Sequence, residues 1–309
     1  MQSTRDFLRR LGLPEREAYD LPSSQRRFPD GAQYRLEIPS TEGPRALRAV
    51  VEAGRRYGVR IHRVSQGSGI MMLTDAEIRE MLTLGRDEGM EVSLFVGPRA
   101  PWDISAEAKS PAGGVIAGCN RGVEQLVHAL EDIRRGCDLG LRGVLIADPG
   151  LLSVAQQMKA AGELPAELVI KTSVQLPTPN PATARLWETL GAGTLNLVVD
   201  LTLPQIASLR AATTLPLDVY VEVPDGFGGF VRHYEVPELV RIASPIYVKL
   251  GLRNAPDIYP SGAHLESTAI ALSQERVRRA RLVLDRLERY YPEAVMSEVG
   301  AEGLAIPQL

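Results

Sequence analysis

The chain has 309 residues, of which 44% are hydrophobic and 24% charged, and its formal net charge is −3. This composition is typical of a globular protein that buries about three-quarters of its unfolded surface, and it lacks the net basic charge expected of a nucleic-acid-binding protein. The two cysteines, Cys119 and Cys137, are too few for a disulfide framework or for the four thiolates that an iron–sulfur cluster usually takes.

Residues 1–32 are polar and irregular, and three prolines interrupt them. We predict a leader with one short helix that lies against the main body. Charges stand in the first ten residues where a signal peptide would need its apolar core, and no apolar run approaches the roughly 18 residues of a spanning helix. We therefore expect a cytoplasmic protein without a membrane partner.

From residue 33 onward, short apolar or alternating runs are each followed by a longer stretch. The predicted strands are 33–39, 59–66, 90–97, 142–148, 167–175, 193–200, 215–223 and 245–250, and the clearest helices are 43–57, 75–88, 122–139 and 270–290. Eight such units over residues 33–291 match the typical length of a (β/α)8 TIM barrel, about 250 residues. The alternative, a doubly wound open sheet, lacks its GxGxxG fingerprint after the first strand. Residues 292–309 form a short tail.

The longest connection, residues 98–120, follows the third strand and contains three prolines and Trp102. Such a long loop in a compact domain is usually functional or disordered, and we interpret it as a lid over the catalytic end of the barrel. The glycine-rich turn at 226–229, after the seventh strand, is either a phosphate-binding turn or a flexible one.

Successive side chains of a strand point to opposite faces, so one set faces the helices and the other the barrel interior. The inward set is polar: Arg35, Glu37, Lys171, Ser173, Gln175, Asn196, Asp218, Tyr220, Glu222, Tyr247 and Lys249. In the second strand we expect His62 and Gln66 to point inward, although Arg63 and Ser65 fit almost as well. Because unpaired buried charges are costly, the charged members must neutralise one another or meet a ligand.

Only four of the 35 basic residues are lysines, and Lys171 and Lys249 both fall on inward positions. A desolvated lysine can act as a base or form a Schiff base, and paired carboxylates can divide into acid and base. The candidate catalytic groups are therefore Glu37, Glu222, Lys171 and Lys249. Three carboxylates, Glu37, Asp148 and Glu222, could instead hold a divalent metal. Gln66, Asn196 and Tyr220 are candidate substrate contacts, and the alternative is an ion-pair network that only stabilises the barrel.

At the fifth strand, residues 173–180 read Ser-Val-Gln-Leu-Pro-Thr-Pro-Asn. This string resembles the Ser-x-Gln…Asn element of the collagenase-like peptidases, family 32 among the peptidases of unknown catalytic type. Residues 249–253 are similar to the family's Lys-Ile-Glu-Gly-Arg motif in the lysine and the arginine, and residues 147–150 resemble its Asp-x-Gly turn. The resemblance covers about residues 33–290. It implies a barrel with these site positions: Asp148, Ser173, Gln175, Asn180, Lys249 and Arg253.

Two departures from the family pattern are clear. Glu222-Val223 stands where the family has histidine and glycine, and the cysteine-rich signature that follows is missing, so we expect no iron–sulfur cluster. The family label implies a hydrolase acting on a peptide or small-molecule substrate. The residues themselves leave open two alternatives, a lyase or isomerase that acts on a carbonyl or phosphorylated acid through a barrel lysine, and a non-catalytic ligand-binding barrel. A homo-oligomer remains open as well.

Overall fold

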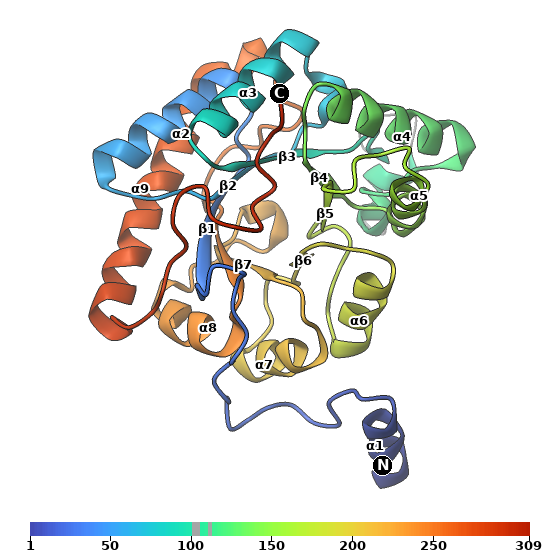
Figure 1. The fold of residues 1–309 in the computed structure, drawn as a ribbon, viewed down its shortest axis with the longest axis vertical. Helices are drawn as coiled ribbons and strands as arrows, with labels where there is room; N and C mark the ends of the chain where they lie inside the picture. The colour runs from blue at the N-terminus through green and yellow to red at the C-terminus, as the bar shows by residue number, and fades with distance from the viewer. Residues whose placement is uncertain (101–105, 111–112) are drawn as a thin grey trace.

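The computed structural model describes residues 1–100, 106–110 and 113–309. Eight parallel strands stand at its centre (Figure 1): β1 (Tyr34–Pro39), β2 (Arg63–Gln66), β3 (Glu91–Phe95), β4 (Gly143–Ile146), β5 (Val169–Thr172), β6 (Leu195–Asn196), β7 (Leu217–Glu222) and β8 (Ile246–Leu250). They pair in the order β5-β4-β3-β2-β1-β8-β7-β6. Between β5 and β6 a parallel bridge of Lys171 with Thr194 completes the circle. The predicted TIM barrel is confirmed.

Nine α-helices are seen in the described residues: α1 (Gln2–Arg10), α2 (Pro44–Tyr57), α3 (Asp75–Asp87), α4 (Gly122–Asp138), α5 (Pro149–Ala160), α6 (Pro181–Thr189), α7 (Leu203–Ala212), α8 (Val236–Ala243) and α9 (Glu266–Tyr290). Short 3₁₀ turns lie in the connections: η1 (Ile70–Met72), η3 (Glu107–Lys109), η4 (Gly113–Ile116), η5 (Asp225–Phe227), η6 (His233–Glu235) and η7 (Ala263–Leu265). A capping box starts α3, because the side chains of Thr74 and Glu77 accept from each other's backbone N–H. All four helices singled out in the sequence are found within a few residues of their predicted bounds.

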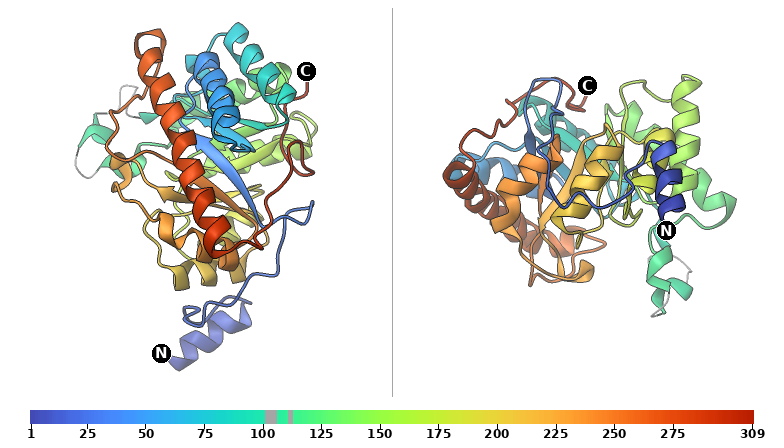
Figure 2. Two further views of the ribbon diagram at one scale, coloured as in Figure 1. Left: turned by 90° about the vertical axis from the view of Figure 1, so that its left-hand side faces the viewer. Right: turned by 90° about the horizontal axis from the view of Figure 1, so that it is seen from below.

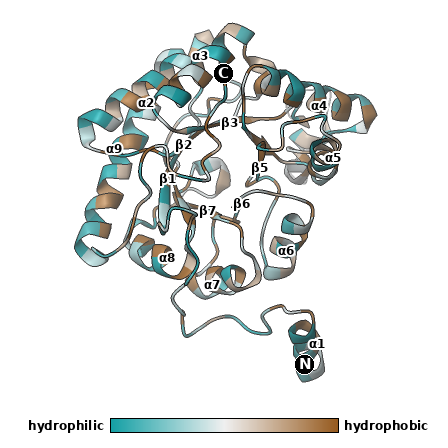
Figure 3. Ribbon diagram, viewed as in Figure 1, coloured by the Kyte–Doolittle hydropathy of each residue, from teal (hydrophilic) through white to brown (hydrophobic). Residues whose placement is uncertain are grey.

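The hydrophobic core lies between the strands and the helices that surround them (Figure 3). In β8, for example, Ile246, Val248 and Leu250 are fully buried among helix side chains, while Tyr247 and Lys249 alternate with them. The alternation leaves the inside of the barrel to polar side chains, and this is the part of the fold that positions the site.

The N-terminal ends of the strands are closed by both chain termini. In the leader, Phe28 packs edge-on against Tyr247, with 5.3 Å between the ring centroids, whereas α1 projects from the barrel (Figure 2) and buries no residue. The tail crosses the same end, where Arg35 donates hydrogen bonds to Ser297 Oγ (2.9 Å) and to the Glu302 carbonyl (2.6 Å). The opposite end of the barrel, at the carboxyl ends of the strands, stays open.

Part of the predicted lid, residues 101–105 with Trp102 and residues 111–112, lies outside the described residues. The described part contains η3 and η4 and contributes Gly114, Ala117 and Cys119 to the cavity at the open end of the barrel. The role of this loop as a lid stays a prediction. In the described part of the chain, no helix is both long and apolar enough to cross a membrane.

Candidate active site

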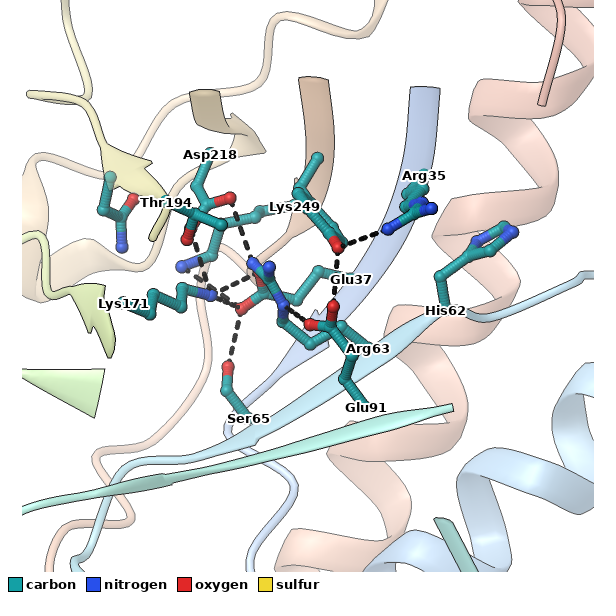
Figure 4. A network of polar contacts seen from close by, with 12 residues as sticks. Arg35, Glu37, His62, Arg63, Ser65, Glu91, Lys171, Thr194, Asp218 and Lys249 are labelled. Carbon is teal, nitrogen blue, oxygen red and sulfur yellow. Dashed lines mark hydrogen bonds and ion pairs between the residues drawn. The ribbon is translucent and has the colours of Figure 1, made fainter. Parts of the chain in front are cut away.

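An ion-pair network fills the barrel interior (Figure 4). At its centre, the Glu37 carboxylate on β1 accepts hydrogen bonds from Lys171 on β5, from Arg63 Nη1 on β2 at 3.1 Å and from Ser65 Oγ at 2.6 Å. Lys249 Nζ on β8 lies 3.4 Å from the same carboxylate. The strands therefore direct four polar partners at one buried carboxylate.

Two more carboxylates balance the remaining positive charge. Arg63 Nη1 pairs with Asp218 at 3.0 Å, Arg63 Nε pairs with Glu91, and Lys171 Nζ lies 3.4 Å from Asp218. Three buried carboxylates thus face three buried cations, which explains how a barrel can tolerate so many charges in its interior. The sequence-based expectation that the charged side chains neutralise one another is met for this set.

The network fixes the protonation of its members. Burial raises the pKa of Glu37, but the positive charges of Lys171, Lys249 and Arg63 outweigh it, so the pKa of this carboxyl lies well below its usual range. Burial lowers the pKa of Lys171 to about 7, although Asp218 and Glu37 pull it upward. Lys171 is thus the cation of this set with a pKa brought near neutrality.

The preferred assignment for the second strand was wrong for His62 but correct for Gln66, which lines the cavity. Arg63 and Ser65 point into the barrel, whereas His62 lies at the N-terminal end, where its Nδ1 accepts from the Leu36 N–H at 3.1 Å and its Nε2 lies 2.8 Å from the Ser297 carbonyl. β2 starts at Arg63, so His62 belongs to the connection before the strand and is buried by the tail.

Above the network, a cavity of about 920 Å³ opens at the carboxyl ends of the strands. Its wall combines apolar side chains such as Leu145, Leu176 and Phe227 with a few polar ones. This combination of an apolar wall with converging polar groups is typical of a small-molecule site.

Lys249 connects the network to the cavity. Its side chain is 1% exposed, lines the cavity and places Nζ 4.3 Å from the centroid of the Tyr220 ring. With the Asn196 amide in the orientation that satisfies its neighbours, the side-chain oxygen accepts from Lys249 Nζ at 2.9 Å and from the Val174 N–H at 3.2 Å. The ammonium is thereby fixed between Glu37 below and the cavity above.

The predicted site residues divide into two groups. Six of them line the cavity together: Gln66, Ser173, Gln175, Asn196, Tyr220 and Lys249. The others do not line it: Glu37, Asp148, Lys171, Asn180, Glu222 and Arg253. Glu37 lies beneath the cavity and contacts two of its lining residues, Lys249 and Ser65.

Two of the family positions serve as helix caps. Asn180 Oδ1 accepts from the Thr183 N–H at the start of α6 (3.0 Å), and Asp148 Oδ1 accepts from the Leu151 N–H at the start of α5 (2.7 Å). Asp148 Oδ2 also accepts from the Asn120 N–H at 3.1 Å, which ties the long loop to α5. Their immediate contacts are those of local structure.

Glu222 and Arg253 form a separate cluster at the ends of β7 and β8. Glu222 Oε1 accepts from the Arg253 N–H at 3.1 Å, and its Oε2 lies 3.2 Å from His233 Nε2. Burial raises the pKa of Glu222, but these two contacts lower it further than burial raises it. The Arg253 side chain is more than half exposed and points to Asp225 at 3.8 Å rather than into the cavity.

The three predicted metal ligands are held apart by the ion pairs and hydrogen bonds that each of them makes. Among the described residues, no three His, Cys, Asp or Glu side chains form a group that could hold a metal ion. Glu37 is surrounded by cations, Asp148 caps a helix and Glu222 faces His233. The structure therefore does not bring Glu37, Asp148 and Glu222 together as a metal site.

Several polar cavity residues were not predicted from the sequence, among them Arg99, Tyr259 and Arg276. Arg99 stacks on Phe95, with its guanidinium carbon 3.6 Å from the ring centroid, and donates to the Gly67 carbonyl. Arg276 comes from α9, and Tyr259 from the loop after β8. In a sequence with 31 arginines, nothing local distinguishes the two that face the cavity.

Comparison with known proteins supports the resemblance found in the sequence. The model described as Peptidase family U32 matches residues 119–223, which contain β4 to β7. Lys249 and Glu37 lie outside the matched segment. No curated protein matches the chain.

Three solved structures illustrate the structural likeness. The U32 peptidase Mk0906 has a TM-score of 0.43 at 17% identity, with 72% of this chain and 94% of that chain covered. A putative phosphonomutase from Burkholderia cenocepacia J2315 has a TM-score of 0.43 at 15% identity, with 71% and 87% covered. A putative fructose-1,6-biphosphate aldolase from Coccidioides immitis has a TM-score of 0.49 at 10% identity, with 83% and 93% covered.

Proposed function

We propose that this protein is a barrel enzyme that hydrolyses an amide bond of a small substrate bound over Lys249, because residues 119–223 match the model of Peptidase family U32. The observation that carries the proposal is the position of Lys249. Among the described residues it is the lysine that lines the cavity, and its ammonium is held by Glu37 and Asn196 at the cavity floor.

In amide hydrolysis, water adds to the carbonyl carbon and negative charge develops on the carbonyl oxygen. An ammonium held in a buried site stabilises that charge far better than it would in water, and it needs no reorganisation during the reaction. We assign this electrostatic role to Lys249. Asn196 and Glu37 act on it as positioning residues, since both contact Nζ from the barrel side.

The leaving nitrogen must receive a proton when the carbon–nitrogen bond breaks. Tyr220 lines the cavity next to Lys249, and burial raises the pKa of its phenol, with the negative charge of Glu37 adding to the effect. The phenol therefore stays protonated at neutral pH and can serve as the proton donor; the phenolate that results takes up the proton released by the water that has added to the carbonyl carbon.

A lysine-dependent lyase or isomerase is the second candidate. One observation favours it: among the described cavity residues, the acidic side chains are the exposed Asp225 and Asp257, and neither is buried as a base that activates water would be. In this alternative, Lys249 forms a Schiff base with a carbonyl substrate, with loss of water. Lys171 is excluded from this role because it does not reach the cavity.

The first prediction tests Lys249. Lys249→Met should abolish turnover of N-acetylated dipeptides, measured by the appearance of new free amine in a mass-spectrometric assay, because the developing charge loses its partner. Lys159→Met on α5 removes a lysine that does not line the cavity and is the matched control. Unchanged turnover in a folded Lys249→Met variant contradicts the proposal. A substrate adduct trapped on Lys249 by borohydride would contradict the hydrolase proposal and support the lyase or isomerase alternative.

A further inference from the structure

Arg276 is a buried arginine on the wall of the cavity, and no acidic side chain in the described part of the chain lies in ion-pair contact with it. It is 4% exposed, and its Nη1 donates to the Ser40 carbonyl at 3.2 Å. Its Nε is buried without a hydrogen-bond partner among the described residues. Buried guanidinium groups are normally paired, because an isolated buried charge is costly.

The backbone around Arg276 is itself unusual. Ser40, whose carbonyl accepts the Arg276 hydrogen bond, has a φ of 56°, a left-handed conformation that is uncommon for residues other than glycine. Ser40 also lines the cavity and contacts the Tyr259 hydroxyl. Strained positions of this kind concentrate at ligand sites, where the surrounding structure holds them in place.

Arg276 differs from the buried cations of the barrel interior in having no carboxylate partner among the described residues. Arg63, Lys171 and Lys249 each contact a carboxylate of the network, so their charge is met by the protein. Arg276 lines the cavity and donates to the Ser40 carbonyl, and among the described residues the buried carboxylates Glu42 and Glu222 act on it only from beyond ion-pair distance. We propose that Arg276 anchors a carboxylate group of the substrate, so that the ligand is a small carboxylic acid such as a short peptide with a free C terminus.

A carboxylate is favoured over a phosphate by the loops at the cavity mouth. Phosphate sites in barrels use backbone N–H groups of the turns after the last strands. Here the N–H groups of Phe227, Gly228 and Gly229 donate to carbonyls within their own turn. Those of Gly67 and Ser68 donate to the Glu42 carboxylate. Recognition is left to side chains, and the planar fork of arginine matches a carboxylate in a bidentate manner.

This inference rests on the proposed function only for its peptide example. Carboxylate binding at Arg276 is measured without turnover, so the two can fail separately. If the native chain binds carboxylates but does not hydrolyse the amide substrate, only the proposed function is contradicted. If it hydrolyses the substrate without preferring a carboxylate, only the role of Arg276 is contradicted.

The experiment measures binding of pyruvate, succinate and N-acetyl-alanyl-alanine to the full chain by calorimetry, each beside its neutral amide, with inorganic phosphate as a further probe. We expect at least one acid to bind more tightly than its amide. Arg276→Met should weaken the binding of that acid by about tenfold to a hundredfold, which is the effect of removing a hydrogen bond to a charged group. It should leave the binding of the amide unchanged. Arg276→Lys should restore part of the loss.

Arg278→Met, on the exposed side of α9, is the matched control and should bind as the native chain does. The melting temperature of the free protein gives a second readout, because removal of an unpaired buried charge should leave it unchanged or raise it. Three outcomes overturn the proposal: no acid binds better than its amide, phosphate binds more tightly than every acid, or Arg276→Met lowers the melting temperature as loss of a structural residue would.

Discussion

Lys171 and Lys249 show how two chemically identical residues on equivalent strand positions acquire different roles. Both are 1% exposed and both contact Glu37. Lys171 is surrounded by Glu37 and Asp218 below the cavity, whereas Lys249 has the Tyr220 ring and the cavity on its other side. Lys171 therefore lies within the ion-pair network, whereas Lys249 lies at the floor of the cavity, and our proposal assigns a part in the chemistry to Lys249 alone.

This difference leads to a prediction for Lys171. Lys171→Met should lower the free energy of unfolding by about 3–5 kcal/mol, because Glu37 and Asp218 lose a buried partner. Denaturant unfolding measures the change. Lys159→Met is the control, because Lys159 is a half-buried lysine that donates to a backbone carbonyl. A loss below about 1 kcal/mol, the usual range of surface ion pairs, would show that the network contributes little.

At the scale of elements, the two ends of the chain differ although both are short and lie outside the strand–helix repeat. The tail supplies Ser297 and the Glu302 carbonyl to Arg35, and the Ala305 N–H to Glu91, so it completes the contacts of buried interior charges. The helix α1 buries no side chain. Residues 292–309 are therefore part of the barrel's polar interior, while α1 is an appendage.

The corresponding prediction compares two truncations. Deletion of residues 292–309 should destabilise the protein by more than about 3 kcal/mol, since several hydrogen bonds to the charged groups of Arg35 and Glu91 are lost at about 1.5–3 kcal/mol each. Deletion of residues 2–10 should change the stability by no more than about 0.5 kcal/mol, as expected for exposed residues. Thermal unfolding of both variants provides the measurement, and equal losses would contradict this assignment.

At the scale of the whole molecule, acid sensitivity follows from His62, where β1, β2 and the tail meet. Burial lowers the pKa of His62 from 6.5 to about 4, although the Ser297 carbonyl opposes it. The Leu36 N–H donates to Nδ1, so protonation at that atom would break a backbone hydrogen bond. The folded protein thus holds His62 neutral over a pH range in which the unfolded chain protonates it.

The sign of the pH effect follows from proton uptake. Between pH 6.5 and 4 the unfolded state binds more protons at this site, so stability is complete above pH 6.5 and falls as the pH decreases, by about 3 kcal/mol at the lower limit. His62→Gln can accept from Leu36 and donate to Ser297 without titrating, and should remove this slope. Unfolding free energies of both proteins between pH 5 and 6.5 test the prediction, and parallel curves would contradict it.

The sequence by itself determined the barrel and its polar interior, because strand length, helix periodicity and the alternation of side chains are local properties of the chain. It also placed Lys249, Tyr220 and Asn196 on inward strand positions, because successive side chains of a strand alternate between its two faces.

Only the tertiary structure decided which of these side chains reach the cavity. Asn180 and Asp148 carry family motifs but bond the first turns of their helices, while Arg276 comes from the last helix to face Ser40 near the first strand. A cavity is formed where loops and helix ends from distant parts of the chain converge. Whether a charge there is paired or free depends on partners that local periodicity does not specify.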